Sequence, residues 1–354
     1  MFRLYERRIC LLRDKMNEFD ALLMASSMNI GYFTGFFPGF QSLLFVPRDD
    51  EVVLFVSRAD ASLAEETCRF RVEVVGKEGY VEKLKVLLKE DVKKVGVEES
   101  LEAGMFSRLK REFPGVSFDF FGGLWDIRSV KSDEEIKAIR KSIEIAEAGL
   151  RAAVESISVG VRECDVAAEA EYEMRRLGAE SFPFETIVAS GSRGASPHAT
   201  CSKRKIRRGD AVVIDLGARY EHYCSDITRT VIVGRNDKME KALSLVIKAQ
   251  EAALSMVKSE VSCSELDLAA RKVLEREGYE KYFLHSLGHG IGLEVHEPPS
   301  ISSTNKANIR EKMVFTIEPG VYMHGVGGVR VEDTVVTEKK KGKVLTKLPK
   351  EFFV

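Results

Sequence analysis

The chain has 354 residues, a length at which two domains are the usual arrangement. Its 54 lysine and arginine residues nearly balance 55 aspartate and glutamate residues, and the formal net charge is -1. This balance provides no single-sign field of the kind that binds nucleic acid or a membrane surface, so we expect a small peptide or another small molecule as the partner.

The N-terminal segment carries charged residues without a following apolar stretch, and no window approaches the roughly 20 apolar residues that span a bilayer. The six cysteines are scattered and form no Cys-x-x-Cys pair, which favours reduced thiols. We therefore expect a cytoplasmic protein. Charged residues make up 31% of the chain and amide residues are few, which suggests a thermophilic source.

Short apolar segments alternate with amphipathic stretches in the first third of the chain, a pattern typical of an α/β domain. Strands are predicted at 20–26, 42–47, 51–57, 72–76, 93–99 and 116–121. The turn at 47–51 indicates a hairpin, and residues 80–90 have apolar side chains at helical spacing. No Gly-x-Gly-x-x-Gly follows a strand, so no dinucleotide site is predicted.

Paired glycines and a polar run interrupt this pattern after Phe121. We therefore expect an N-terminal domain at residues 1–124, a linker at residues 125–132 and a second domain at residues 133–354. The sequence features that point to chemistry all lie in the second domain.

The second domain repeats itself once. Residues 143–180 and 246–280 both have the pattern of a long helix, a short polar break and a second helix. Each second helix carries the motif Glu-x-Asp-x-Ala-Ala, at residues 163–168 and again at 265–270. A duplicated unit of this kind is expected to fold with pseudo-twofold symmetry.

Each half then ends in a predicted hairpin with two carboxylates, Asp215 and Asp226 in the first and Glu318 and Glu332 in the second. A carboxylate in an apolar strand costs several kcal/mol unless it is paired, hydrogen-bonded or bound to a cation. Four separate salt bridges are one explanation. If pseudo-twofold symmetry brings the four groups together, however, they repel one another unless cations lie among them. We therefore predict a site for two divalent metal ions.

Histidines supply the remaining candidate groups. His289 is predicted as a fifth ligand, because its flanking glycines let the backbone approach a crowded centre. His285 and His296 lie in the same glycine-rich segment, and His198 lies in a polar loop. Carboxylates with one imidazole favour divalent Mn, Co, Fe or Zn over thiolate-bound metals. No role is predicted for His222, at the expected tip of the first hairpin.

The order Asp, Asp, His, Glu, Glu resembles that of the pita-bread metallopeptidases (family M24), which include methionine aminopeptidase, aminopeptidase P and Xaa-Pro dipeptidase, or prolidase. The segments that carry it are VVIDLG, SDITRT, GHGIGLEVHE, TIEPGVY and GGVRVEDTV. DALLMASSMNIGYFTGF and the junction IRSVKSDEEIKAIRKSIEIA resemble the creatinase-type N-terminal domain of the proline-specific branch. The resemblance covers essentially the whole chain. It implies an α/β N-terminal domain followed by an α+β pita-bread domain with an internal pseudo-twofold repeat.

The resemblance also implies how the metal ions are held. Asp215 would bind the first ion, His289 and Glu318 the second, and Asp226 and Glu332 would bridge the two. Mn²⁺ or Co²⁺ is implied first, with Zn²⁺ and Fe²⁺ as alternatives. A water or hydroxide between the ions is implied as the nucleophile.

Other roles follow from the same resemblance. Glu318 is implied as a proton shuttle, His296 as the group that stabilises the tetrahedral intermediate, and His198 as a substrate contact. Arg330 lies two residues before a ligand, so alternation places both on one strand face, and we expect it to orient a carboxylate. For His285 two alternatives stay open, because it could line the substrate pocket or pack in the core. Tyr322 is assigned no site role.

The implied reaction is hydrolysis of the peptide bond before proline in Xaa-Pro dipeptides, in a homodimer. The alternative is aminopeptidase P, which releases the first residue of longer Xaa-Pro peptides. Some prolidases have an arginine soon after His-Glu-x-Pro, whereas here Ser300 follows residues 296–299. The compact length favours the dipeptidase. A non-catalytic scaffold and a creatinase-like enzyme are less favoured, because all five ligand positions are filled.

Overall fold

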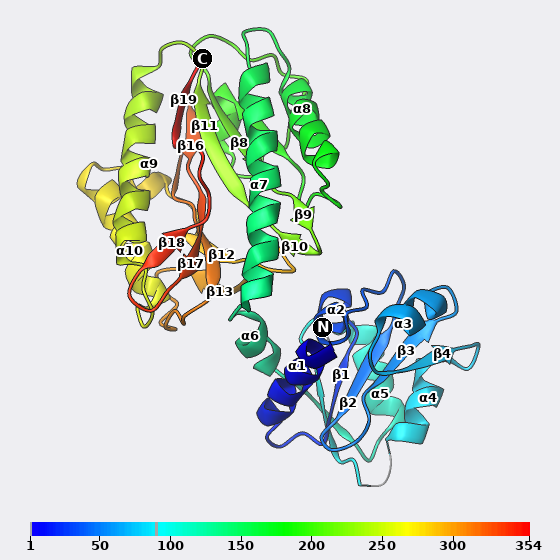
Figure 1. The fold of residues 1–354 in the computed structure, drawn as a ribbon. Helices are drawn as coiled ribbons and strands as arrows, with labels where there is room; N and C mark the ends of the chain where they lie inside the picture. Colours follow the sequence, from blue (N-terminus) through cyan, green and yellow to red (C-terminus); the bar gives the residue numbers. More distant parts are fainter. Residues whose placement is uncertain (1, 89–90) are drawn as a thin grey trace. The chain divides into compact units, whose positions relative to one another are not determined.

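The computed structural model describes residues 2–88 and 91–354, which form two compact units that divide between Arg128 and Ser129 (Figure 1). The division falls inside the range 125–132 that we expected to be a linker. Part of that range is helical, in α6 (Gly123–Arg128), which buries Leu124 and Ile127. None of the helices in the described residues has the length and hydropathy needed to span a bilayer.

The first unit contains a six-stranded mixed sheet with the order β4-β3-β2-β1-β5-β6. Each strand overlaps a predicted one, and the bounds are β1 (Ala21–Met24), β2 (Leu43–Pro47), β3 (Val53–Ser57), β4 (Arg71–Val75), β5 (Lys94–Val97) and β6 (Ser117–Phe120). β2 and β3 form the predicted antiparallel hairpin. β1 pairs antiparallel with β2 and parallel with β5, so the α/β expectation for this domain is confirmed.

Six helices accompany this sheet among the residues that the structure describes. They are α1 (Phe2–Lys15), α2 (Ser27–Thr34), α3 (Ala61–Thr67), α4 (Gly79–Leu87), α5 (Ala103–Glu112) and α6. α4 confirms the helix predicted from residue 80, and it buries Val81 and Leu84. The last two residues of that predicted stretch, 89 and 90, lie outside the described residues.

The second unit confirms the duplicated helix pairs. The helices are α7 (Asp133–Ser156), α8 (Glu163–Arg176), α9 (Asp237–Met256) and α10 (Cys263–Arg276). α7 packs on α8, and α9 packs on α10. Gly149 permits the close approach of the first pair, because a Cβ there would lie 2.4 Å from Met174 Cγ.

The strands of the second unit form two larger sheets, β19-β11-β8-β7 and β13-β12-β14-β17-β18, and two small hairpins, β9-β10 and β15-β16. In Figure 1 the two larger sheets lie between α7 and α8 on one side and α9 and α10 on the other. The strand bounds are β7 (Ile187–Ser190), β8 (Ala211–Leu216), β9 (Arg219–Tyr220), β10 (Tyr223–Cys224), β11 (Ile227–Ile232), β12 (Gly288–Gly290), β13 (Glu297–Ile301), β14 (Val314–Ile317), β15 (Gly320–Met323), β16 (Gly327–Arg330), β17 (Asp333–Thr337), β18 (Gly342–Val344) and β19 (Glu351–Phe353). Two 3-10 helices, η1 (Gly191–Ala195) and η2 (Glu280–Tyr282), complete the unit.

The two carboxylate-bearing hairpins of the second unit have the same plan. β8 and β11 are the antiparallel outer arms of the first, and β9-β10 forms its tip. β14 and β17 are the outer arms of the second, and β15-β16 forms its tip. His222 lies in the first tip with a φ of 68°, as the expected turn requires. None of the six cysteines, all of which are described, is joined in a disulfide.

Arg229 joins the first hairpin to the C-terminal end of the chain. Its side chain is fully buried, and its Nη2 lies 2.7 Å from Asp333 Oδ1. The same guanidinium donates to the carbonyl oxygens of Pro349 at 2.6 Å and Leu348 at 2.9 Å. The buried charge is therefore paired and hydrogen-bonded, as a stable buried ion pair requires.

We expect Arg229→Met to lower the free energy of unfolding of the second unit by about 3–5 kcal/mol, because it removes the cation that faces the buried Asp333. Denaturant unfolding measures this loss. Arg235→Met is the matched control, because its ion pair with Asp237 is exposed, with side-chain exposures of 84% and 73%, and should leave stability unchanged. Equal stability of the two variants would contradict the assignment.

Candidate metal centre

The four predicted carboxylates lie at equivalent ends of the two hairpins. Asp215 is on β8, and Asp226 lies directly before β11. Glu318 follows β14, and Glu332 lies directly before β17. The amide of Glu332 donates to the carbonyl oxygen of Thr228 at 3.1 Å, so the backbones of the two halves meet at this centre.

The imidazole of His289 faces these carboxylates. Its Nε2 lies 3.2 Å from Glu318 Oε1 and 3.6 Å from Asp226 Oδ2. Its Nδ1 lies 3.1 Å from the carbonyl oxygen of Gly290, which can only accept, so we assign a proton to Nδ1. Ligand atoms of Asp226, His289 and Glu332 all lie within 4.8 Å of one another, a spacing at which one ion could be shared.

The glycines beside His289 are required by packing. A Cβ on Gly288 would lie 2.0 Å from the carbonyl oxygen of Thr316, and a Cβ on Gly290 would lie 2.3 Å from that of Pro298. Side chains at these positions would force β12 away from its neighbours, which is the close backbone approach that we expected from the sequence.

The centre contains buried acceptors that need donors or cations. In the part of the chain that the structure describes, Asp215 Oδ1, Asp226 Oδ1 and Glu332 Oε1 are buried without a hydrogen-bond partner. An ionised carboxylate can only accept, and a buried one is costly when unpaired. Divalent ions with oxygen and imidazole ligands fit this donor set.

The pKa values of the centre point the same way. Burial raises the pKa of Asp226 well above its usual range, and the charges of Glu332 and Asp215 add to the shift. Burial likewise raises the pKa of Glu332, with Glu318 and Asp215 adding to it. The pKa of Glu318 falls to about 2 although burial opposes ionisation, because the hydrogen bond and charge of His289 outweigh it. The four carboxylates therefore cannot all ionise without added positive charge.

Arg330 supplies part of that charge. Its Nη2 lies 2.5 Å from Asp215 Oδ2, and its Nε donates to Thr228 Oγ1 at 3.1 Å. The hydroxyl of Thr228 in turn donates to Glu332 Oε2 at 2.7 Å. Arg330 thus contacts one predicted ligand directly and another through Thr228, and the direct partner is in the other half of the repeat.

His285 joins the same network. Its Nδ1 lies 2.8 Å from the carbonyl oxygen of Ser286, which can only accept, so we assign the proton of the neutral ring to Nδ1. Nε2 then accepts from the hydroxyl of Tyr322 at 2.9 Å, and that hydroxyl accepts from Arg330 Nη1 at 2.7 Å. Burial raises the pKa of Tyr322 to about 12, so the phenol stays protonated.

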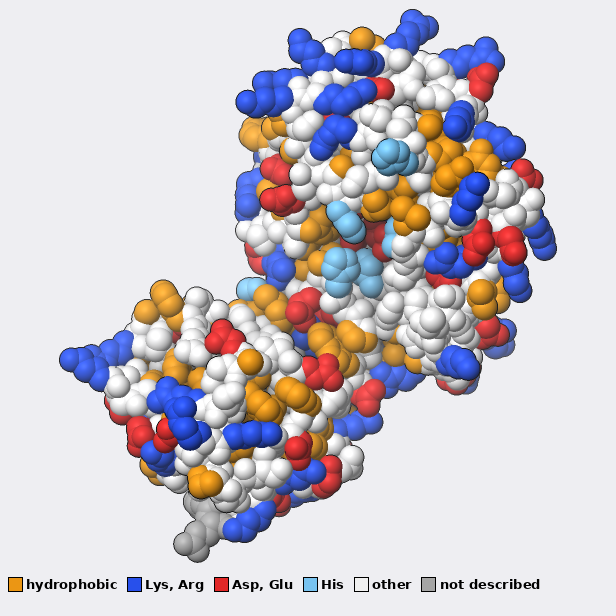
Figure 2. All heavy atoms as spheres, turned by 180° about the vertical axis from the view of Figure 1, so that it is seen from behind, with side chains coloured by type: hydrophobic (Ala, Val, Ile, Leu, Met, Phe, Trp, Pro, Cys, Tyr) orange, Lys and Arg blue, Asp and Glu red, His pale blue; other side chains and the backbone are white. Residues whose placement is uncertain are grey.

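A cavity of about 500 Å³ opens over the centre. Its lining includes Phe184, Glu185, Ile187, Pro197, His198, Thr200, Asp215, Asp226, His285, Ser286, His289, His296, Glu318 and Arg330. Figure 2 shows histidine side chains gathered around acidic ones in a hollow of this face. The structure therefore brings the predicted site residues together, with Glu332 buried beneath the cavity at 1% exposure. Of the two alternatives for His285, the structure places it in the cavity wall.

Sequence reasoning gave no site role to several neighbours of the centre. The sequence assigns Tyr322 no site role, although a buried tyrosine hydroxyl usually has a partner. It assigns none to Thr228 either, although alternation places this residue on the same face as Asp226. The cavity residues Phe184 and Glu185 precede β7 in a segment without a distinctive pattern.

Two family descriptions match this sequence. "Metallopeptidase family M24" matches residues 137–339, and "Creatinase/Prolidase N-terminal domain" matches residues 8–130. The Xaa-Pro dipeptidase of Pyrococcus horikoshii is 42% identical over 347 residues, which cover 98% of this chain and 97% of that protein. The Xaa-Pro dipeptidase of Pyrococcus furiosus is 41% identical over 337 residues, which cover 95% of both.

Solved structures are similar along the whole chain. The crystal structure of the prolidase from Pyrococcus horikoshii OT3 has a TM-score of 0.93 and 40% identity, and the match covers 97% of this chain and 99% of that one. The X-Pro aminopeptidase from Thermotoga maritima MSB8 has a TM-score of 0.90 and 37% identity, and the match covers 99% of both chains.

We expect Mn²⁺ to raise the melting temperature of the metal-free protein more at high pH than at low pH. The raised pKa values of Asp226 and Glu332 favour the folded state at low pH, where both groups are protonated, and this contribution is lost as pH rises through those values. Bound cations would remove that loss. Calorimetry with and without Mn²⁺ tests this, and an equal shift at both pH values would count against it.

Proposed function

Because this chain belongs to metallopeptidase family M24, we propose that it hydrolyses the peptide bond before proline in Xaa-Pro dipeptides. The observation that carries this proposal is the convergence of five side chains, three of which have a buried oxygen with no hydrogen-bond partner in the described residues. Relatives that match over nearly the full length bear the name Xaa-Pro dipeptidase.

The metal-binding role of the centre is part of the proposal. Two divalent ions, Mn²⁺ or Co²⁺ first and Zn²⁺ or Fe²⁺ as alternatives, would be held by Asp215, Asp226, His289, Glu318 and Glu332. Bound there, such ions polarise a peptide carbonyl and lower the pKa of water. The chain supplies the surrounding groups, which orient the ligands and move the protons.

Three side chains of the cavity have proposed chemical roles. Glu318 lines the cavity and is proposed to accept a proton and pass it to the leaving nitrogen. Burial and the nearby charge of His289 lower the pKa of His296, so its ring stays neutral and can donate one hydrogen bond to a developing oxyanion. His198 lines the cavity and is proposed to contact the substrate.

The substrate class fits the size and lining of the cavity. An Xaa-Pro bond is a tertiary amide without an N–H, so enzymes that read a regular extended backbone are hindered. About 500 Å³ lies within the usual range for small-ligand sites, and Phe184 and Ile187 offer apolar surface for a proline ring.

We further propose that the protein is a cytoplasmic homodimer.

Aminopeptidase P activity is the second candidate. It is supported by the likeness to the X-Pro aminopeptidase of Thermotoga maritima and by Ser300, which stands where some prolidases have an arginine. A creatinase-like reaction and a non-catalytic role are less favoured, because all five ligand positions are filled.

We expect Asp226→Asn and Glu332→Gln to lower turnover of Ala-Pro by at least about 100-fold, because each removes a proposed bridging ligand. Metal analysis after loading should show reduced metal content in both variants. His222→Gln is the control, since His222 lies at the tip of β9-β10, and it should keep full activity and metal content. Full turnover in the bridging variants would show that these carboxylates are not ligands.

Peptide length distinguishes the two candidate activities. We expect kcat/KM for Ala-Pro to exceed that for Ala-Pro-Ala and longer peptides, because a dipeptidase site receives the carboxylate that follows proline. Hydrolysis of both peptides by the Mn²⁺-loaded protein measures the ratio. Preference for the longer peptides would favour aminopeptidase P instead.

A further inference from the structure

We infer that Glu163 and Asp267, one from each copy of the Glu-x-Asp-x-Ala-Ala motif, are positioning residues that hold the histidine-bearing segments of the site. The inference rests on the proposed function, because it assigns those segments to substrate and metal binding. Both side chains are fully buried, and neither lines the cavity. Each acts through the backbone of another segment.

Glu163 accepts hydrogen bonds from both ends of the loop at residues 190–202, which carries His198. Its Oε1 accepts from the amide of Ser190 at 2.8 Å and the hydroxyl of Ser190 at 2.6 Å. Its Oε2 accepts from the amide of Ser202 at 3.1 Å and the hydroxyl of Ser202 at 2.6 Å. Arg193 adds a fifth bond to Oε2 at 2.7 Å and donates to the carbonyl oxygen of Thr200 at 2.7 Å.

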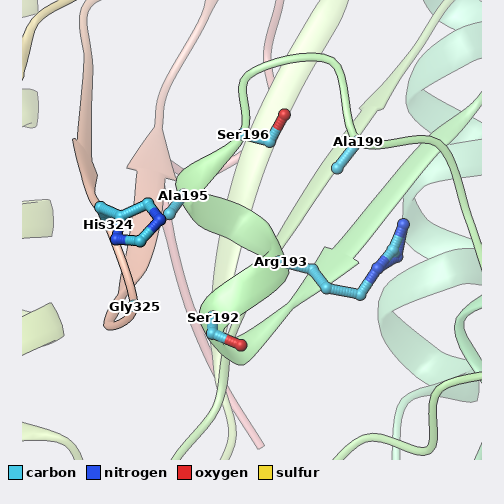
Figure 3. A pocket seen from close by; sticks show the side chains of 7 residues that line it. All are labelled: Ser192, Arg193, Ala195, Ser196, Ala199, His324 and Gly325. Carbon is cyan, nitrogen blue, oxygen red and sulfur yellow. The ribbon is translucent and has the colours of Figure 1, made fainter.

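A cavity lies on each side of this loop, so part of its surface has no packed neighbour. Pro197, His198 and Thr200 line the catalytic cavity. A second cavity of about 470 Å³ is lined by Ser192, Arg193, Ala195, Ser196, Ala199, His324 and Gly325 (Figure 3). In Figure 3 the side chain of Arg193 points away from His324 and Ala195. Within the loop η1 packs against β16, whereas His198 and Thr200 are exposed, so the bonds of Glu163 fix the two ends of a segment whose His198 part is little packed.

Asp267 does the same for the segment that leads to His289. Its Oδ1 accepts from the amide of Leu287 at 3.0 Å, and its Oδ2 accepts from Arg271 Nε at 2.6 Å. Arg271 Nη2 donates to the carbonyl oxygen of His285 at 2.7 Å. The pair therefore fixes the backbone on both sides of Ser286, just before β12.

The two copies of the motif use different acids for this task. In α8 the buried acid is the glutamate, and Asp165 is the exposed capping-box acid that pairs with the N-cap residue Arg162. In α10 the buried acid is the aspartate, and Glu265 is the capping-box acid that accepts from the N-cap residue Ser262. Each motif thus supplies one positioning acid and one capping-box acid, and the capping-box acids are matched controls within the same six residues.

The test compares Glu163→Gln and Asp267→Asn with Asp165→Asn and Glu265→Gln. Glu163→Gln should lower kcat/KM for Ala-Pro by about tenfold or more with unchanged metal content, because its loop carries no proposed ligand. Asp267→Asn should lower both activity and metal content, because its segment leads to His289. The two capping-box variants should stay within about twofold of the parent in both measurements.

A double-mutant cycle separates positioning from general stability. If Glu163 acts through the loop of His198, Glu163→Gln should add little to the loss in a His198→Ala background. Ser202→Ala, which removes one bond to Glu163, should show a smaller loss in the same direction, and it serves if Glu163→Gln does not fold. Equal losses in both backgrounds, or parental kinetics in Glu163→Gln and Ser202→Ala, would overturn the inference for Glu163.

The metal readout keeps the inference separate from the proposed activity. If the parent protein binds Mn²⁺ but cleaves no Xaa-Pro peptide, the proposed function fails. Asp267→Asn should still lower metal content and the Mn²⁺-induced rise in melting temperature relative to Glu265→Gln. Equal metal binding by these two variants would overturn the inference for Asp267.

Discussion

Repulsion among four carboxylates in one small, largely buried volume is the constraint on which the rest of the second unit depends. The backbone holds them together through paired hairpins, and Arg330 and Thr228 satisfy part of their charge and hydrogen bonding. Three buried oxygens still lack partners among the described residues, so the protein is built for added cations rather than for its own charges alone.

Continuous apolar segments and regular helical spacing made much of the fold predictable from the sequence. The six strands of the first unit and the two helix pairs of the second were found because burial on both faces, or on one helix face, leaves a local pattern. The site was found because Asp215 and Glu318 interrupt such apolar segments. Each inference needed only residues close together in the sequence.

The contacts that sequence reasoning missed are those made across long separations. Alternation indicated the face of Arg330 but not that its direct partner is Asp215, which lies in the other half of the repeat. The place of His285 could not be decided, because it depends on a hydrogen bond from Tyr322. The repeated motif was visible, yet the exchange of roles between its two acids depends on where each helix begins, at Glu163 in α8 and at Cys263 in α10.

The backbone bond between Glu332 and Thr228 marks the seam where the two halves of the second unit meet. Neither half alone contains the full set of five side chains, so a half-length ancestor could have built such a centre only as a pair of identical copies. Joining the copies in one polypeptide replaces a concentration-dependent encounter with a permanent one. It also lets the two halves diverge. The proposed ligand set shows this, because its one imidazole, His289, comes from the second half only.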